Sequence, residues 1–111
     1  MEFQTPPVVA SPIDGGVRLT FSGPIHLNVS WLEGELNKVT ATKPKLVEMD
    51  LAGTEHISSL GLGLIVGFRN GIKKNGGNVR IVKIRKRTMG ILKTATLDRL
   101  LEVDPAGIIE K

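Results

Sequence analysis

The stretch that decides the fold spans residues 46–71 and reads LVEMDLAGTEHISSLGLGLIVGFRNG. Apolar and polar residues alternate through residues 47–51, the pattern of a half-buried β-strand. A polar loop and the pair Ser58 and Ser59 follow, and the apolar segment after them predicts a helix. The first N–H groups of a helix have no partner within it and attract anions. We therefore expect recognition or chemistry at this strand–loop–helix junction.

The sequence on both sides of the junction completes an α/β pattern. Alternating segments predict strands over residues 17–21, 46–51 and 79–84, and residues 8–13 could form a short edge strand before them. Helical patterns follow residue 30, residue 58 and Thr88, which we take as the cap of a short third helix. Residues 100–103 fit either a last edge strand or a helical turn. We predict a mixed sheet of four to five strands with three to four helices packed against it, and parallel pairing of the later strands.

The length of 111 residues indicates one domain, because a chain of this size supports a single hydrophobic core. We expect the domain to span residues 1–111, with loosely ordered residues 1–12 and a tail at 104–111. The longest apolar run, residues 60–68, is far shorter than the roughly 20 residues that span a bilayer. The acidic, proline-interrupted start does not read as a signal peptide. We therefore expect a cytoplasmic protein.

Several kinds of chemistry are not expected from this composition. The chain has no cysteine, so disulfides, thiolate catalysis and zinc–sulfur sites are excluded. His26 and His56 lie far apart without carboxylates at ligand spacing, so we expect no metal site. No Ser–His–acid set is identifiable, and we expect neither catalytic residues nor a cofactor.

Glycines recur in the predicted second helix, although each costs about 1 kcal/mol relative to alanine in a helix interior. Gly63, Gly67 and Gly71 are four residues apart and form a smooth stripe, which we interpret as tight packing of the helix on the sheet. Gly61 lies in the first turn, where a missing side chain opens the surface around Ser59. Leu60 and Leu62 flank Gly61, and we expect both to be partly exposed in a protein contact.

The segment VEMDLAGTEHISSLGLG, residues 47–63, resembles the signature region of the STAS domain family, the fold of bacterial anti-sigma-factor antagonists. The family pattern there is a strand ending in Asp-Leu, then a loop and Asp-Ser-Ser-Gly-Leu-Gly. In this chain Asp50 and Leu51 match the strand end, residues 61–63 match Gly-Leu-Gly, and Ser59 falls on the phosphorylated serine. Residues 92–103 are similar to the closing helix of the family. The resemblance covers about residues 17–103.

This resemblance implies a regulatory module that binds an anti-sigma factor with serine-kinase activity and is released by phosphorylation of Ser59, with Ser58 as the alternative site. Gly23–His26 lies where many members have Gly-Glu-Leu-Asp, in a loop that faces the serine. Ser58 and His26 replace two aspartates of the family, and Leu60 replaces a small residue. Self-association stays open. The partner-binding residues implied by the resemblance are His26, Leu27, Asn28, Ser58, Leu60, Gly61 and Leu62.

Three alternatives remain. Within the family, the chain could be a non-phosphorylated scaffold or a transporter-associated domain. A nucleotide-binding domain is a distant alternative, because the glycines at 61, 63 and 67 form a weak dinucleotide fingerprint that is separated from its strand by a polar loop. A basic cluster could bind nucleic acid, but it lacks interleaved aromatic residues, so we expect no nucleic-acid partner and interpret it as a solvated face or a docking surface for an acidic partner. The cluster consists of Arg80, Lys83, Arg85, Lys86, Arg87 and Lys93.

Overall fold

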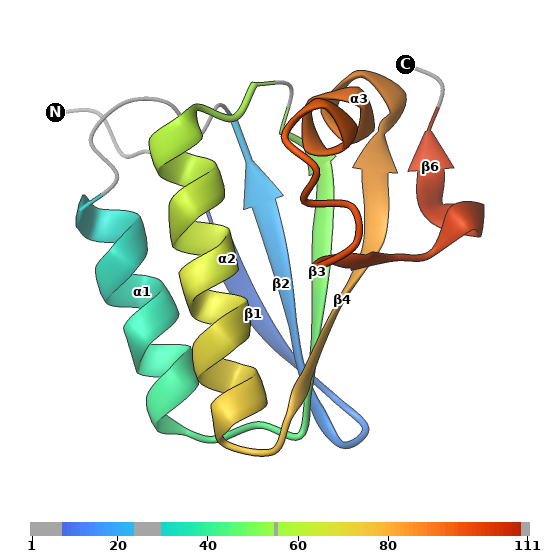
Figure 1. Ribbon diagram of the computed structural model, residues 1–111. Coiled ribbons are helices and arrows are strands. Elements are labelled where there is room, and N and C mark those ends of the chain that lie inside the picture. Colours follow the sequence, from blue (N-terminus) through green and yellow to red (C-terminus); the bar gives the residue numbers. More distant parts are fainter. Residues whose placement is uncertain (1–7, 24–29, 55, 110–111) are drawn as a thin grey trace, which may run out of the picture.

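The computed structural model describes residues 8–23, 30–54 and 56–109 (Figure 1). Six strands alternate with three α-helices and one 3₁₀ turn. The strands are β1 (Val8–Ile13), β2 (Gly16–Ser22), β3 (Leu46–Gly53), β4 (Asn78–Arg85), β5 (Glu102–Val103) and β6 (Ile108–Ile109). The helices are α1 (Ser30–Ala41), α2 (Ser59–Lys74) and α3 (Lys86–Thr94), and the 3₁₀ turn η1 is Pro105–Gly107.

The strands form one mixed sheet in the order β1-β2-β3-β4-β5, and β6 also pairs with β4. The hairpin β1–β2 is antiparallel, whereas β2, β3 and β4 run parallel, as expected for strands joined by helical crossovers. The predicted α/β class and the mixed sheet are therefore confirmed. The sheet gains a sixth strand because the residues after 101 return to β4 and form β5 and β6.

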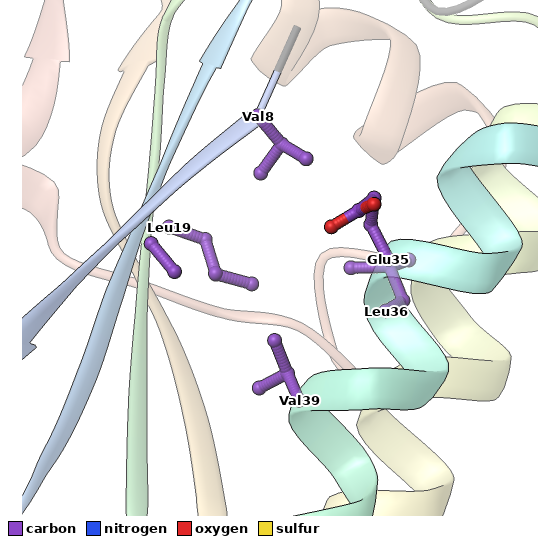
Figure 2. Close-up of a pocket in the computed structure, with 6 residues that line it drawn as sticks. Val8, Leu19, Glu35, Leu36 and Val39 are labelled. Atoms are coloured by element: carbon purple, nitrogen blue, oxygen red, sulfur yellow. The ribbon is translucent and has the colours of Figure 1, made fainter. Parts of the chain in front are cut away.

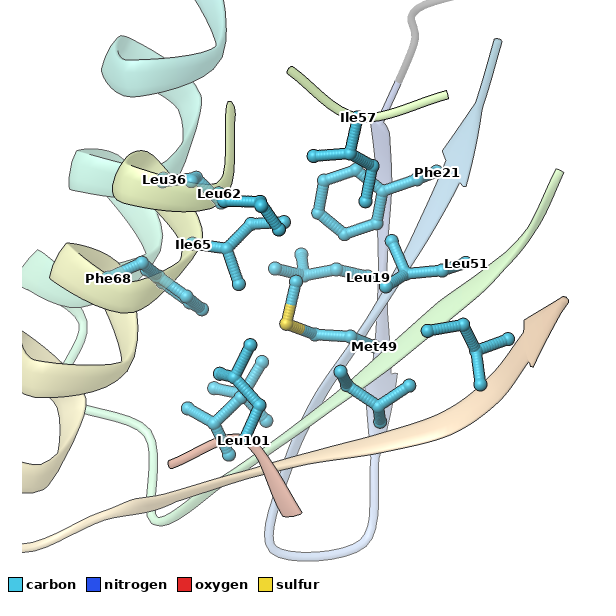
Figure 3. Close-up of a cluster of buried hydrophobic side chains, with 14 of the residues drawn as sticks. Leu19, Phe21, Leu36, Met49, Leu51, Ile57, Leu62, Ile65, Phe68 and Leu101 are labelled. Atoms are coloured by element: carbon cyan, nitrogen blue, oxygen red, sulfur yellow. The ribbon is translucent and has the colours of Figure 1, made fainter. Parts of the chain in front are cut away.

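One face of the sheet carries the hydrophobic core. Alternate residues of the central strands, such as Phe21, Met49 and Ile81, are at most 1% exposed and point toward the helices. The helices contribute apolar residues to the same cluster, including Leu36 and Ile65, and Leu101 closes its lower end (Figure 3). The alternation in each strand thus explains why the helices cover this face (Figure 1).

The opposite face of the sheet carries a row of alternating charges across four strands. Arg18 lies beside Glu48, with its Nη2 2.8 Å from the Glu48 carboxylate. Arg80 follows on the next strand and pairs with Glu102 at 3.4 Å. Parallel sheets usually have both faces covered by helices. This row of paired charges lets the uncovered face remain in contact with water.

The two terminal segments are more ordered than expected. Residues 8–12, which we expected to be loosely ordered, form most of β1, because they pair with β2 through a two-residue turn. Residues 105–109 of the expected tail form η1 and β6. Gly107 permits this return, since a Cβ there would lie 1.9 Å from the Val82 carbonyl oxygen. Residues 102–103 form an edge strand, the first of the two alternatives considered.

Helix α3 begins at Lys86, so the prediction that Thr88 caps it is wrong. Thr88 lies inside the first turn, is fully buried, and donates its hydroxyl to the Thr54 carbonyl oxygen at 3.2 Å. Arg85 precedes the helix without providing a side-chain cap. The threonine therefore connects α3 to the loop after β3 instead of capping its own helix.

Candidate functional site

The two serines at the start of α2 have different structural roles. Ser58 is the N-cap, with extended backbone angles and an Oγ that accepts a hydrogen bond from Gly61 N at 3.1 Å. This bond satisfies one of the free N–H groups of the first turn. Ser58 is therefore the cap of α2.

Ser59 is the first residue of α2 and is exposed. Its hydroxyl makes no hydrogen bond with any residue that the structure describes. Leu60 is 70% exposed, more than any other large apolar side chain in the described part of the chain. A free hydroxyl and a solvated leucine therefore lie side by side at a helix N-terminus.

The next two residues turn inward. Gly61 is buried, and Leu62 is only 7% exposed and belongs to the core cluster. The expectation that Leu62 is partly exposed beside Leu60 is therefore wrong. Two residues rotate a helix by about 200°, which places Leu62 on the side of α2 that faces the sheet (Figure 3). Leu60 remains as the apolar side chain of the exposed turn.

The end of β3 and the loop that leads to α2 are held by residues from β4 and α3. Arg85 donates from Nε to the Ala52 carbonyl oxygen at 2.6 Å, and the Thr88 hydroxyl donates to the carbonyl oxygen of Thr54. Near the end of β3, the Asp50 carboxylate accepts a hydrogen bond from Ala52 N at 3.0 Å. These bonds fix the approach to Ser58. Sequence analysis missed this role of Arg85 and Thr88, because nothing in the local sequence links them to a loop more than 30 residues earlier.

The glycine stripe of α2 faces α1, not the sheet as we expected. A Cβ on Gly63 or Gly67 would meet nothing within 4 Å, and one on Gly71 would approach the Thr40 methyl group at 3.3 Å. The missing side chains leave a groove of about 260 Å³ between the two helices. Its lining consists of Glu33, Leu36, Asn37, Thr40, Gly63, Leu64, Gly67, Phe68 and Gly71. Packing on the sheet instead uses the apolar residues Leu62, Ile65, Phe68 and Ile72, all of them buried.

The basic cluster is divided among different surroundings. Arg80 lies in the charge row of the open sheet face, and Arg85 binds the Ala52 carbonyl oxygen near the end of β3. Lys86, Arg87 and Lys93 are exposed on α3. The basic residues therefore do not form one continuous surface patch on a single helix or strand.

The remaining candidate residues are placed as follows. His26, Leu27 and Asn28 lie outside the described residues, so their assignment to the partner surface stays a prediction. His56 is exposed in the loop before α2. Among the residues that the structure describes, no group of three His, Asp or Glu side chains could hold a metal ion. No helix in that part of the chain is long and apolar enough to cross a bilayer.

Comparison with known proteins identifies the fold. Residues 8–106 match the family model of the STAS domain. An anti-sigma factor antagonist from Mycobacterium paratuberculosis has 23% identity and a TM-score of 0.78, over 88% of this chain and 84% of that one. The Bacillus cell fate determinant SpoIIAA in its phosphorylated form has 11% identity and a TM-score of 0.67, over 87% of this chain and 90% of that one. No curated protein sequence matches significantly.

A structural likeness also extends to a transport-related protein. A sulfate transporter family protein from Wolinella succinogenes has 16% identity and a TM-score of 0.67, over 83% of this chain and 74% of that one. At these identities the solved structures show the fold alone. The family model spans nearly the whole sequence and includes the junction of β3 and α2. The chain therefore belongs to the STAS domain family.

Proposed function

We propose that the protein is a regulatory module of the anti-sigma-factor antagonist kind. Its unphosphorylated form binds an anti-sigma factor with serine-kinase activity through the exposed first turn of α2, and phosphorylation of Ser59 releases it. The observation that carries this proposal is the division of roles between the serines. Ser58 is engaged as the cap, which leaves the Ser59 hydroxyl exposed and available to a kinase.

Electrostatics favours a switch that acts on the partner and not on the fold. A phosphate adds about −1.5 to −2 charges at neutral pH. At the N-terminus of α2 the helix dipole and free N–H groups favour this charge, so the domain itself tolerates it. A partner that covers Leu60 would have to desolvate the phosphate beside it, which is costly for an apolar or acidic surface. Binding is therefore lost while the protein stays folded.

The proposed contact surface combines Ser59 and Leu60 with the loop residues His26, Leu27 and Asn28. Gly61 is buried in the first turn, so it does not belong to this surface. Leu62 supports the turn from inside, because it is buried. The partner supplies the ATP in this mechanism, so the chain itself needs no cofactor, metal or catalytic group. We propose the cytoplasm as the place of action, since a sigma-factor regulator works there.

The test is mass spectrometry of the intact protein and its fragments after recovery from its native cells, under growth and under stress. We expect a phosphoryl group on the peptide that contains both serines. It should disappear in Ser59→Ala and persist in Ser58→Ala, which keeps the proposed acceptor and removes only the cap. A chain that is unmodified in both conditions, or modified at Ser58 alone, would contradict the proposal.

A second candidate is a constitutive STAS scaffold or transporter-associated domain, as the likeness to the Wolinella succinogenes protein suggests. The replacement of an aspartate by Ser58 also removes a carboxylate that a kinase could recognise. In this case Ser59 stays unmodified and Leu60 belongs to a permanent contact. The nucleotide-binding alternative has less support, because Gly63 and Gly67 line the groove toward α1 and not the helix N-terminus where a pyrophosphate would bind.

A further inference from the structure

Strand β1 forms an open edge of the sheet. It is the first strand in the sheet order and pairs only with β2 among the described strands. The other edge consists of β5 and β6, which have two residues each. Long open edges present unpaired backbone groups and can pair with a strand of another molecule. β1, with six residues, is the edge of this sheet that can do so.

The hairpin fixes which backbone groups of β1 point outward. Ile13 and Gly16 are paired across a two-residue turn, and such a pair exchanges its hydrogen bonds within the hairpin. Hydrogen-bonded and non-hydrogen-bonded pairs alternate along an antiparallel ladder. The N–H and C=O groups of Val8 and Ala10 therefore point away from β2, as does the carbonyl of Pro12. Pro12 fits this pattern, because its missing N–H would also have pointed outward.

The side chains of β1 carry no charge, and Arg18 and Glu35 beside this strand are each paired. β1 reads VVASPI and is the only described strand longer than two residues that lacks a charged residue. Arg18, opposite Ser11, is paired with Glu48. Glu35, which lies near Val8 in a small pocket between β1 and α1, is paired with Lys38 at 3.3 Å (Figure 2). Proteins commonly protect open edges with charged side chains or proline. β1 has no charged residue, and its one proline, Pro12, is next to its last residue and still offers a carbonyl acceptor.

We propose that β1 is the contact surface for a second copy of this chain, with the two β1 strands pairing antiparallel about a two-fold axis at Ala10. In this pair each Ala10 N–H donates to the Ala10 carbonyl of the other copy, and each Val8 N–H donates to a Pro12 carbonyl. The edge is self-complementary, because Pro12 lies at a position where the pair needs only a hydrogen-bond acceptor. Val9, which is 43% exposed, then lies beside Ser11 of the second copy.

The proposed pair leaves the Ser59 surface accessible. β1 is separated from β3, the strand that leads to Ser59, by β2. Each pair would therefore display two separate copies of the first turn of α2. Self-association through β1 does not depend on phosphorylation, so it can be tested independently of the proposed function.

The test combines analytical ultracentrifugation over a concentration series with two substitutions at one position. Ala10→Pro removes the two central intermolecular donors and retains every bond from β1 to β2, so it should raise the dissociation constant of the dimer by about tenfold or more. Ala10→Thr keeps the N–H and should dimerise like the natural chain. Thermal unfolding of both variants shows whether the fold is retained. A chain that stays monomeric at every concentration, or a dimer that Ala10→Pro leaves unchanged, would overturn the proposal.

A second measurement tests the register in the natural chain without any substitution. In a mixture of isotope-labelled and unlabelled protein, a filtered nuclear Overhauser experiment detects contacts between copies. Non-hydrogen-bonded pairs bring Cα atoms to about 4.5 Å, so we expect a signal between Hα of Val9 and Hα of Ser11 in the other copy. Intermolecular signals confined to other elements would rule out pairing through β1.

Discussion

Helix α2 has two sides that contribute to the protein in different ways. The side toward the sheet carries Leu62, Ile65, Phe68 and Ile72, none more than 7% exposed. The other side begins with Ser59 and Leu60 and continues through the glycine stripe, where side chains are short or solvated. In the proposed function, folding and recognition therefore use separate residues of one helix. Substitutions on the two sides should therefore have separate effects.

The largest effect is expected from Phe68→Ala. The side chain is 5% exposed and packs in the core, so its truncation removes apolar burial and leaves a cavity. We expect the free energy of unfolding to fall by about 3–5 kcal/mol, measured by urea denaturation. A loss below about 1 kcal/mol would show that the sheet-facing side does not carry the stability of the domain.

The same truncation at two leucines tests the boundary between the sides. Leu62→Ala should lower the free energy of unfolding by about 2–4 kcal/mol, because Leu62 is in the core. Leu60→Ala should change it by less than about 0.5 kcal/mol, because the side chain is mostly in water. Urea denaturation of the two variants in parallel measures this difference. Equal losses would contradict the assignment of the two leucines to opposite sides.

The third prediction concerns the cap. Ser58→Ala removes the acceptor of Gly61 N and should destabilise the protein by about 1 kcal/mol in thermal or chemical unfolding. Ser59→Ala is the matched control and should have almost no effect on stability, since its hydroxyl has no partner among the described residues. If Ser59→Ala destabilised the protein more than Ser58→Ala, Ser59 and not Ser58 would be the cap.

The smallest effect is a gain in stability. Gly67→Ala adds a methyl group in open space within a helix and should raise the free energy of unfolding by about 0.5–1 kcal/mol. Gly71→Ala should gain less, because the new Cβ would lie 3.3 Å from the Thr40 methyl group. Differential scanning calorimetry of both variants measures the contrast. A clear loss at Gly67 would mean that the groove side of α2 is more crowded than the structure shows.

The central strands β2, β3 and β4 could be predicted from the sequence, because apolar and polar residues alternate along each of them. This alternation is recognisable even where the exact ends of a strand are uncertain. The rotation of α2 about its own axis could not be predicted in this way. An error of one residue in the choice of the face that packs on the sheet corresponds to a rotation of about 100°. Leu62 was misplaced for this reason. The glycine spacing showed that a smooth stripe exists, but spacing does not say whether a sheet or a helix lies opposite. The places of β6 and Thr88 depend on contacts between residues distant in sequence.

The end of β3 and the loop after it are held through their main chain. Arg85 and Thr88 donate hydrogen bonds to the main-chain carbonyl oxygens of Ala52 and Thr54. Every amino acid supplies such an oxygen, whatever its side chain. An exposed side chain in this loop, such as His56, can therefore change during evolution without loss of the bonds that position Ser58 and Ser59, whereas Thr54 and Ile57 are buried. Relatives could diversify their partners by altering the loop while the serine keeps its place. The residues that must stay constant for this purpose lie on β4 and α3, far along the chain from the surface they support.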